Sequence, residues 1–343
     1  MIITSPGPGL ATLLQAALSI RSAFIAELMA AETNSYRLFN GEADGRTGLT
    51  IDRYGDLILV ESFRGPLSEN DLSEIEAFYA PLVPEAVLIY NDRSVGDLSV
   101  VNPLPPAQIN AAMLPREARE LGVAYRMQGR HQGHEPLLPL ELRPLRRQVM
   151  AEATGKTVLN VFANTCSTGI AAAKAGATFV VNVDASDYAL SIGKESVRIN
   201  TLPVRPRFVK SDAFAAMRQF AGIGQAERVR GKRMPPFPKI EPRQFDLVVL
   251  DPPAYGKSAF GVINSLIDYA SVFKPALLCT APGGRLICTH RVSEVDRTTW
   301  GEQLTRAAAK AGRPIKELSW IELDADFAPA SGREALKVAL LRI

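Results

Sequence analysis

Acidic residues close or directly follow three apolar runs in the second half of the sequence, at Asp184, Asp212 and Asp251. Because an ionised carboxylate accepts hydrogen bonds in pairs, Asp184 could bind both hydroxyls of a ribose. Asp212, with Ala213 beside it, could accept from the amine of an adenine that packs on an apolar wall. A structural interpretation competes for Asp184, since the residue before a helix often caps its first turn. Ser186 could fill that capping role by itself.

The third acidic residue begins the segment Asp251-Pro252-Pro253-Ala254-Tyr255. Two prolines fix the backbone after Asp251, so that its side chain and the neighbouring carbonyls face a cleft rigidly. A planar base with an amine could hydrogen-bond there, and Tyr255 could stack on it. We therefore predict catalytic roles for Asp251 and Tyr255 and substrate contacts for Pro252 and Pro253. The alternative is a plain strand terminator.

The turn after the first apolar run carries a single glycine, Gly169, in the segment 162–169. A dinucleotide site would need the pattern GxGxxG, which lets the backbone approach a pyrophosphate. Its absence argues against NAD, NADP and FAD, and it fits a ligand that carries no phosphate. The residues predicted to line this ligand site, besides the three acidic residues and Ala213, are Phe162, Asn164, Thr165 and Ala185.

Strands and helices must alternate to bring these residues together. Apolar runs predict buried parallel strands, and the segments between them have helical composition. This order is typical of a doubly wound α/β sheet of Rossmann-like form, in which ligands bind at the carboxyl ends of the strands. The predicted strands are 157–162, 178–184, 207–210, 245–251, 284–290 and 334–343, and the predicted helices are 168–176, 186–200, 212–223, 262–281 and 296–311.

The first part of the chain follows a different pattern. Residues 1–35 form a helical segment, and glycine-punctuated short strands predict a small α+β domain over 36–115. Prolines are frequent between residues 101 and 115, where we place the domain boundary. Residues 116–150 are then a connecting segment that contributes to the ligand pocket, and the α/β domain covers 151–343.

Composition restricts the classes of protein to consider. Charged residues make up 22% and hydrophobic residues 47%, as in a soluble globular protein. No uninterrupted apolar run approaches the roughly 18 residues of a membrane span, and the amino terminus does not resemble a signal peptide. The three cysteines and three histidines lack the spacing of metal ligands, so we expect a cytoplasmic protein without a metal.

Charge is distributed unevenly behind a net charge of +3. Residues 31–100 contain 13 Asp and Glu against 5 Lys and Arg, whereas residues 201–250 contain 10 Lys and Arg against 4 Asp and Glu. A local basic field of this kind suits a polyanion such as RNA. The segment 226–243 is both basic and rich in proline, so it could face a nucleic acid or could be a solvated surface loop.

Taken together, these segments resemble the class I S-adenosylmethionine-dependent methyltransferases that make 5-methylcytosine in large-subunit ribosomal RNA. The resemblance covers about residues 36–343 and is carried by RLFNGEADGRTGLTIDRYGDLILVES, GHEPLLPLELRPLR, VLNVFANTCSTGIAAAKAGA, VVNVDAS, FVKSDAF and FDLVVLDPPAYGKS. It implies S-adenosylmethionine as cofactor, Arg143 as a further cofactor residue, and ribosomal RNA as partner. From the resemblance we expect the family's amino-terminal PUA-type RNA-binding domain to be missing, since only a short helical stretch precedes residue 36.

Departures from the family pattern affect the chemistry. The family's first turn reads TGGFS, but here Cys166 and Ser167 stand in place of two glycines. Its fifth strand ends in SCSG with a nucleophilic cysteine, whereas this chain has Arg291 at that position and Cys288 three residues earlier. Cytosine carbon 5 becomes reactive only after a thiolate adds to carbon 6. Cys288 is thus the candidate nucleophile, and a three-residue offset of about 10 Å on a strand counts against it.

Two further interpretations therefore remain open beside methylation of cytosine carbon 5. The enzyme could methylate a base heteroatom or another substrate, such as a small molecule or a protein, which requires no thiolate. The chain could instead be a non-catalytic descendant that binds S-adenosylmethionine or RNA. His290 and Arg291, at the open end of the fifth strand, are predicted to contact the substrate, and His290 could act as a general base. The sequence also leaves a homodimer open.

Overall fold

The computed structural model describes residues 8–96, 100–131, 136–229, 231–329, 332 and 334–343. The chain forms two compact units. Unit 1 contains residues 1–140 and 324–331, and unit 2 contains residues 141–323 and 332–343.

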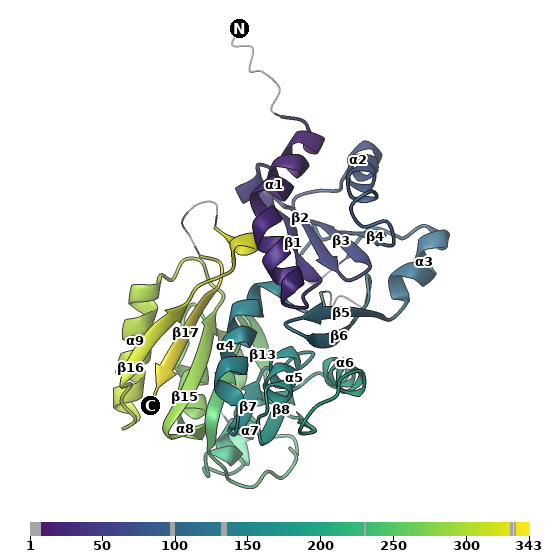
Figure 1. The fold of residues 1–343 in the computed structure, drawn as a ribbon. Helices are drawn as coiled ribbons and strands as arrows, with labels where there is room; N and C mark the ends of the chain where they lie inside the picture. Colours follow the sequence, from purple (N-terminus) through teal and green to yellow (C-terminus); the bar gives the residue numbers. More distant parts are fainter. Residues whose placement is uncertain (1–7, 97–99, 132–135, 230, 330–331, 333) are drawn as a thin grey trace. The chain divides into compact units, whose positions relative to one another are not determined.

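Unit 1 is built on a four-stranded sheet in the order β1-β2-β3-β4 (Figure 1). The first three strands are antiparallel neighbours, and β4 runs parallel to β3. Two helices pack on this sheet and contribute buried residues such as Leu14 of α1 and Ile75 of α2 to its core. The element bounds are α1 Leu10–Ala30, β1 Ser35–Asn40, η1 Gly41–Asp44, β2 Leu49–Tyr54, β3 Leu57–Ser62, α2 Glu69–Tyr79 and β4 Val87–Asp92.

Helix α1 is long and apolar enough, by length and composition alone, to cross a membrane. In unit 1, however, its residues Leu10, Leu14 and Leu28 pack into the core. Arg21 is buried on the same helix and forms an ion pair of 2.7 Å with Asp44. The helix is therefore an integral layer of this unit.

The division between the units differs from the boundary expected at residues 101–115. The hairpin of β5 (Arg116–Glu120) and β6 (Val123–Met127) belongs to unit 1, because Arg119 exchanges hydrogen bonds with Asn34. Residues 324–331 also return to unit 1, where the carboxylate of Asp326 accepts from the amide of Arg37. Contacts between residues distant in the sequence decide both features. Of the remaining elements, α3 Pro106–Met113 lies in unit 1, η2 Leu140–Leu142 lies where the chain passes from unit 1 to unit 2, and η3 Ala325–Phe327 lies in the returning segment.

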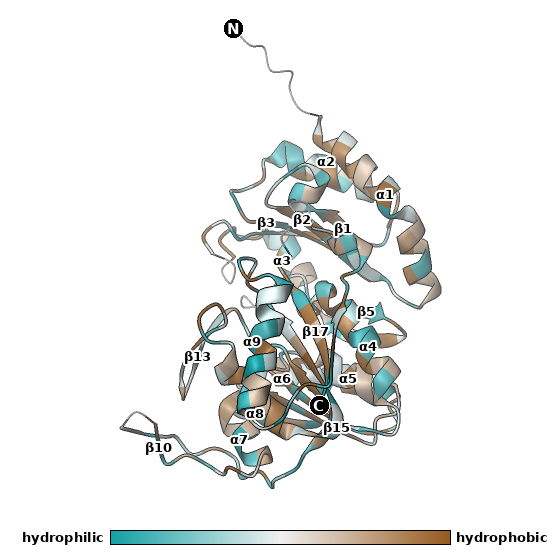
Figure 2. Cartoon of the chain, turned by 90° about the vertical axis from the view of Figure 1, so that its left-hand side faces the viewer, coloured by the Kyte–Doolittle hydropathy of each residue, from teal (hydrophilic) through white to brown (hydrophobic). Residues whose placement is uncertain are grey.

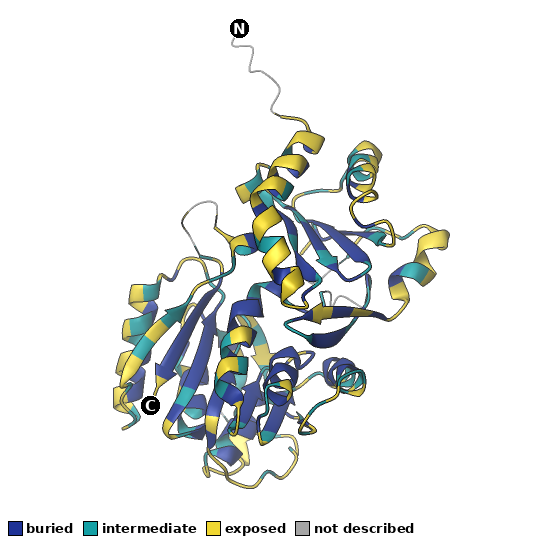
Figure 3. Ribbon diagram, in the orientation of Figure 1, coloured by how far each residue is buried: buried dark blue, intermediate teal, exposed yellow. Residues whose placement is uncertain are grey.

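Unit 2 is built on a seven-stranded sheet in the order β16-β17-β15-β12-β7-β8-β9. Strand β17 is antiparallel to both of its neighbours, and the pairs from β15 to β9 are all parallel. Figure 3 shows the central strands of this sheet as buried. The bounds are β7 Thr157–Val161, β8 Phe179–Asp184, β9 Arg207–Lys210, β12 Phe245–Leu250, β15 Thr280–His290, β16 Glu317–Ile321 and β17 Lys337–Arg342.

Helices cover both faces of this sheet, as predicted for a doubly wound α/β fold. On one face α4 and α5 pack in a core with Leu247 and Ile287, and on the other α7, α8 and α9 pack around Val248 and Leu286. The fold is a doubly wound, Rossmann-like α/β fold. The helices are α4 Arg143–Ala153, α5 Ser167–Lys174, α6 Asp187–Arg198, α7 Ala213–Phe220, α8 Ala270–Cys279 and α9 Arg297–Lys310.

Small elements account for the main differences from the sequence prediction. The helix expected over 262–281 begins only at Ala270, because residues 255–264 form a hairpin of β13 (Tyr255–Ser258) and β14 (Gly261–Asn264). The segment 226–243 contains a two-residue pairing of β10 (Arg228–Val229) with β11 (Lys232–Arg233), and Figure 2 shows this hairpin projecting from unit 2. Strand β16 was not predicted, since its half-exposed residues lack a continuous apolar run.

Gly169 lets helix α5 approach the sheet beneath it. A Cβ atom at this position would lie 2.0 Å from Oδ1 of Asn182 on β8. That oxygen is fixed, because it accepts a hydrogen bond of 2.9 Å from the side-chain amide of Asn160 on β7. Gly169, the single glycine of the segment 162–169, is therefore required by packing.

We predict that Gly169→Ala lowers the free energy of unfolding by at least ~2 kcal/mol, since overpacking forces a buried polar pair to separate. Denaturant unfolding followed by circular dichroism would measure the change. Gly9→Ala is the matched control, because a Cβ atom there meets no atom within 4 Å. Equal stability of the two variants would contradict the packing role of Gly169.

Candidate active site

A small pocket at the carboxyl ends of the unit 2 strands collects six of the predicted site residues. Its volume is 120 Å³, and Phe162, Phe214 and Ile263 give it apolar walls. This is below the ~300–1,000 Å³ of a typical small-molecule site, so it suits one part of a ligand. The predicted residues that line it are Phe162, Asp184, Ala185, Asp212, Ala213 and Pro253, and Phe214, Gly256, Lys257, Ser258 and Ile263 join them.

The turn between β7 and α5 has an unusual backbone. Phe162, Asn164 and Cys166 all have positive φ angles, of 58°, 47° and 64°. Residues other than glycine adopt this left-handed conformation at a cost, and such strain concentrates at functional sites. Cys166 stands where the resembled family has a glycine, and its side chain lies against Gly193 of α6, where a Cβ atom would approach its Sγ to 3.0 Å.

Asp184 holds this strained turn in place. One carboxylate oxygen accepts from the amide of Asn164 at 2.7 Å, and the other accepts from the amide of Ser186 at 2.8 Å. Ser186 caps α6 by accepting from the amide of Ala189, so Asp184 does not serve as the cap. A carboxylate has about four acceptor positions, so each oxygen of Asp184, which lines the pocket, can accept a further hydrogen bond.

Asp212 has partners that the sequence did not indicate. One oxygen caps α7 by accepting from the amides of Phe214 and Ala215. The other accepts from Oγ of Ser258 at 2.7 Å and from the amide of Ala259 at 2.9 Å. Asp212 thus fastens the β13–β14 hairpin beside the pocket that it lines, and its contact with an adenine amine stays a prediction. Ser258 lies 46 residues away in the sequence, and no local pattern connects the two.

Asp251 lies at the end of β12 in an ion-pair cluster with Arg291. The guanidinium donates from Nε at 3.2 Å and from a terminal nitrogen at 3.1 Å to the two carboxylate oxygens. Its other terminal nitrogen donates to Glu141 at 2.9 Å, and Oγ1 of Thr289 donates to Asp251. Burial alone would lower the pKa of Arg291, but Asp251 and Glu141 raise it above its usual value. Arg291 is therefore a permanent cation bound between two carboxylates.

Cys288 does not face this cluster. It is fully buried in the core between the sheet and α8, and burial raises the pKa of its thiol far above the usual value. The strand alternation that places Thr289 next to Asp251 turns the side chain of Cys288 elsewhere. This corrects the candidate assignment of Cys288 as nucleophile. Cys166 and Cys279 are also buried, and burial raises the pKa of both thiols.

His290 is also buried, at 1% exposure, which corrects its prediction as a substrate contact. Its ring stacks on Tyr269 at 5.2 Å between centroids and meets Trp300 edge-on. The amide of Val292 donates to Nδ1 at 3.3 Å, as a neutral imidazole permits. Burial, aided by Lys337, lowers the pKa of His290 to about 4.

The remaining predicted residues differ in exposure. Arg143 is fully buried at the start of α4 and does not line the pocket. One turn later, a terminal guanidinium nitrogen of Arg146 donates to Oγ of Ser167 at 3.4 Å. Tyr255 is 63% exposed on β13, whereas Pro252 is buried. Thr165 is buried and Asn164 is exposed in the strained turn. Residues 133–135, the start of the segment 133–146, lie outside the described residues.

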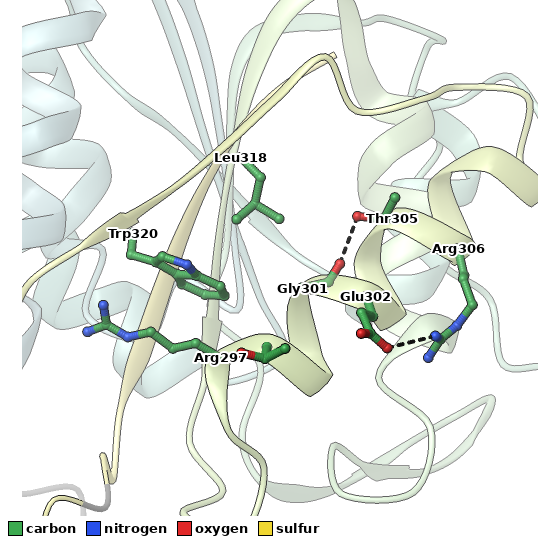
Figure 4. Close-up of a pocket in the computed structure, with 8 residues that line it drawn as sticks. Arg297, Gly301, Glu302, Thr305, Arg306, Leu318 and Trp320 are labelled. Carbon is green, nitrogen blue, oxygen red and sulfur yellow. Dashed lines mark hydrogen bonds and ion pairs between the residues drawn. The ribbon is translucent and has the colours of Figure 1, made fainter.

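A larger pocket of 420 Å³ lies between α9 and β16, and none of the predicted site residues lines it (Figure 4). Arg297 lies over the ring of Trp320 at 5.5 Å and pairs with Glu322 and Glu334, so its charge is compensated. This pocket is not the candidate active site. Among the described residues no group of three His, Cys, Asp or Glu side chains could hold a metal ion.

Comparison with known families identifies the class of protein. The family of S-adenosylmethionine-dependent methyltransferases matches residues 114–340, which is most of the chain. The chain belongs to this family of methyltransferases, and S-adenosylmethionine is its cofactor.

Individual relatives agree with this assignment. The chain is 26% identical over 299 residues to the "Ribosomal RNA large subunit methyltransferase I" of Shigella flexneri, covering 85% of this chain and 70% of the relative. It is also 26% identical over 310 residues to a "Ribosomal RNA large subunit methyltransferase" of Deinococcus radiodurans, covering 89% and 71%. A solved structure from Streptococcus mutans, of a proposed SAM-dependent methyltransferase, superposes with a TM-score of 0.74 and 21% identity, covering 99% of this chain and 84% of that one.

We predict that acidification destabilises the protein through His290. Its folded pKa of about 4 lies below the ordinary value of 6.5, so the unfolded chain binds the proton first as the pH falls. Stability is then lost progressively between pH 6.5 and 4, by about 1–2 kcal/mol from pH 7 to pH 5. Denaturant unfolding at several pH values would measure this loss. His290→Gln does not titrate in this range and should show about 1 kcal/mol less pH dependence; parallel curves for the two proteins would refute the assignment.

Proposed function

We propose that this methyltransferase modifies a base in large-subunit ribosomal RNA, and that the base attacks the cofactor's methyl group directly through a heteroatom. The target class is supported by the names of the relatives from Shigella flexneri and Deinococcus radiodurans, which cover 85% and 89% of the chain. The observation that carries the chemistry is the burial of all three cysteines.

The pocket that Asp184 lines is proposed to hold the adenosine part of S-adenosylmethionine. Its apolar walls, Phe162, Phe214 and Ile263, suit the faces of an adenine. Asp184 would accept the ribose hydroxyls with its remaining lone pairs while it holds the amides of Asn164 and Ser186. The turn at Asn164 and Thr165 would contact the methionine part. The cofactor, when bound, supplies an electrophilic methyl group on a sulfonium.

A covalent route through cytosine carbon 5 requires a thiolate near the cleft. Cys288 lies in the core with its thiol pKa raised, and Arg291 takes the position of the resembled family's nucleophile. A guanidinium that stays protonated cannot add to a pyrimidine. Methylation of an exocyclic amine or a ring nitrogen needs a positioned lone pair and no covalent intermediate.

Asp251 would position the base and would not act as a free general base. Both of its oxygens are bound by Arg291, and one also accepts from Thr289, so its orientation is fixed. The rigid Pro252-Pro253 backbone offers carbonyl oxygens beside it, which can accept from an amine. Tyr255, 63% exposed, provides a face on which the target base can stack.

RNA would approach from the side of the β13–β14 hairpin and of the segment 226–243. Within that segment Arg228 and Arg233 are exposed on the small hairpin of β10 and β11, as phosphate contacts require. Arg230 lies outside the described residues.

Methylation of ribosomal RNA from a strain lacking this gene tests the proposed substrate and chemistry together. Incubation with labelled S-adenosylmethionine should transfer label to large-subunit RNA, and mass spectrometry of the nucleosides should place the methyl on a base heteroatom. RNA containing 5-fluorocytosine should give no covalent complex with the enzyme. An adduct that Cys288→Ala abolishes, or labelled 5-methylcytosine, would instead favour the covalent route.

We predict that Asp184→Ala weakens S-adenosylmethionine binding at least tenfold, since charge-assisted hydrogen bonds contribute about 1.5–3 kcal/mol. Isothermal titration calorimetry would measure the affinity. Asp187→Ala is the matched control, because Asp187 is an exposed carboxylate on the adjoining turn that pairs with Lys210. Thermal unfolding of both variants would separate lost binding from lost folding, and unchanged affinity in a folded Asp184→Ala protein rules out the ribose contact.

A further inference from the structure

The amino-terminal ends of three strands in unit 2 carry two arginines on one aromatic ring. Phe179 is the first residue of β8, Arg207 is the first residue of β9, and Arg243 lies two residues before β12. The central guanidinium carbon of Arg207 lies 4.7 Å from the centroid of the Phe179 ring, and that of Arg243 lies 4.1 Å from it. We call Arg207 and Arg243, which lie on this ring, the Phe179 arginine pair.

The ring itself is anchored in the fold. Phe179 packs against the core of unit 2 and stacks on Phe245 at 6.4 Å between centroids. A guanidinium that lies on a fixed aromatic ring loses fewer conformations when it forms further hydrogen bonds, and its planar fork matches a phosphate. Both arginines are exposed, so their donor groups reach solvent.

The two guanidiniums lack acidic partners within the described part of the chain. No carboxylate forms an ion pair with Arg207 or Arg243 there. The acidic residues nearest in sequence have other partners. Asp246 accepts from the amide and hydroxyl of Thr157, although Arg243 contributes to lowering its pKa, and Glu241 pairs with Lys239 at 3.4 Å.

We propose that the Phe179 arginine pair is a binding site for the phosphate backbone of a structured RNA. This inference rests on the proposed function, because it assigns a second contact surface to the same RNA substrate. Preorganised arginines without acidic partners are suited to bidentate phosphate contacts, which fix the register of a nucleic acid and do not read its sequence. Arg205, exposed two residues before Arg207, adds to the same positive field.

The location of the pair constrains the size of the substrate. Parallel strands of six residues separate it from the carboxyl ends where Asp184 and Asp251 lie. At about 3.3 Å per residue the two sites are roughly 20 Å apart. A short oligonucleotide around the target base would not reach the pair, whereas a folded RNA with further helices would. The enzyme therefore recognises an extended RNA surface.

The test uses the double variant Arg207→Ala/Arg243→Ala. Its control is the double variant Arg306→Ala/Lys310→Ala, which removes two exposed cations of α9 and so changes the net charge by the same amount. Binding would be measured at several salt concentrations, with a folded fragment of large-subunit RNA and with a short oligonucleotide cut from it. Removing two phosphate contacts should weaken binding of the folded RNA about tenfold or more and reduce the salt slope by roughly 1.4–1.8. The short oligonucleotide and S-adenosylmethionine should bind all three proteins equally.

The outcomes separate this inference from the proposed function. If the unaltered protein binds and methylates the folded RNA while the arginine variant matches the α9 control, the phosphate site is refuted and the proposed function stands. If the unaltered protein binds no RNA, the proposed function fails and the inference fails with it. Arg207→Lys/Arg243→Lys retains the charge and loses the planar fork, so an affinity between those of the unaltered protein and the alanine variant supports bidentate contacts. Thermal unfolding would confirm that each variant is folded.

Discussion

The close packing of α5 on the sheet is the constraint on which the pocket lined by Asp184 depends. Gly169 leaves no room for a side chain above Asn182, and Asn182 is held by Asn160 from the neighbouring strand. This fixes where α5 begins, and the five residues before it must close the gap from β7 in a turn with three left-handed residues. The turn is stable because Asp184 binds its backbone at Asn164. One buried amide pair therefore sets the shape of the ligand site.

The same region shows how a sequence accommodates a departure from a family pattern. Cys166 has a left-handed backbone at a position where the resembled family has glycine, and such a residue needs compensation elsewhere. Gly193 on α6 makes room for its side chain, because a Cβ atom at Gly193 would lie 3.0 Å from both Cβ and Sγ of Cys166. The strain is retained at the edge of the pocket. A relaxed turn would carry the amides of this segment away from Asp184.

Electrostatics at the end of β12 determine what chemistry the cleft can support. Arg291 is bound by both Asp251 and Glu141, and its charge compensates two carboxylates that would otherwise repel each other. By the resemblance, Arg291 stands where the family has its nucleophilic cysteine. In the proposed mechanism the cluster would orient the base and would not attack it.

Much of the fold followed from the sequence. Apolar runs predicted the strands β7, β8 and β12 to within one residue, because a strand buried on both faces must be apolar throughout, and the edge strand β9 was also predicted with its observed bounds. The acidic residues after these strands were placed at the carboxyl edge for the same reason. Glu141 was also within reach of the sequence, since it lies in the segment GHEPLLPLELRPLR, which carries part of the family resemblance. The short hairpins and β16 were missed because their residues are half-exposed and lack a periodic signal.

The sequence by itself determined the class of fold, the edge of the sheet where ligands bind, and most of the residues around the pocket. Only the tertiary structure decided what their side chains do. Asp212 fastens a hairpin 46 residues away, His290 lies in an aromatic core, and Cys288 faces away from the cleft. The pattern of apolar residues in a segment predicts how deeply that segment is buried, and this prediction needs only the segment's own residues. The partner of a carboxylate or the direction of a thiol depends on which distant segments meet, and that is fixed only when the chain folds.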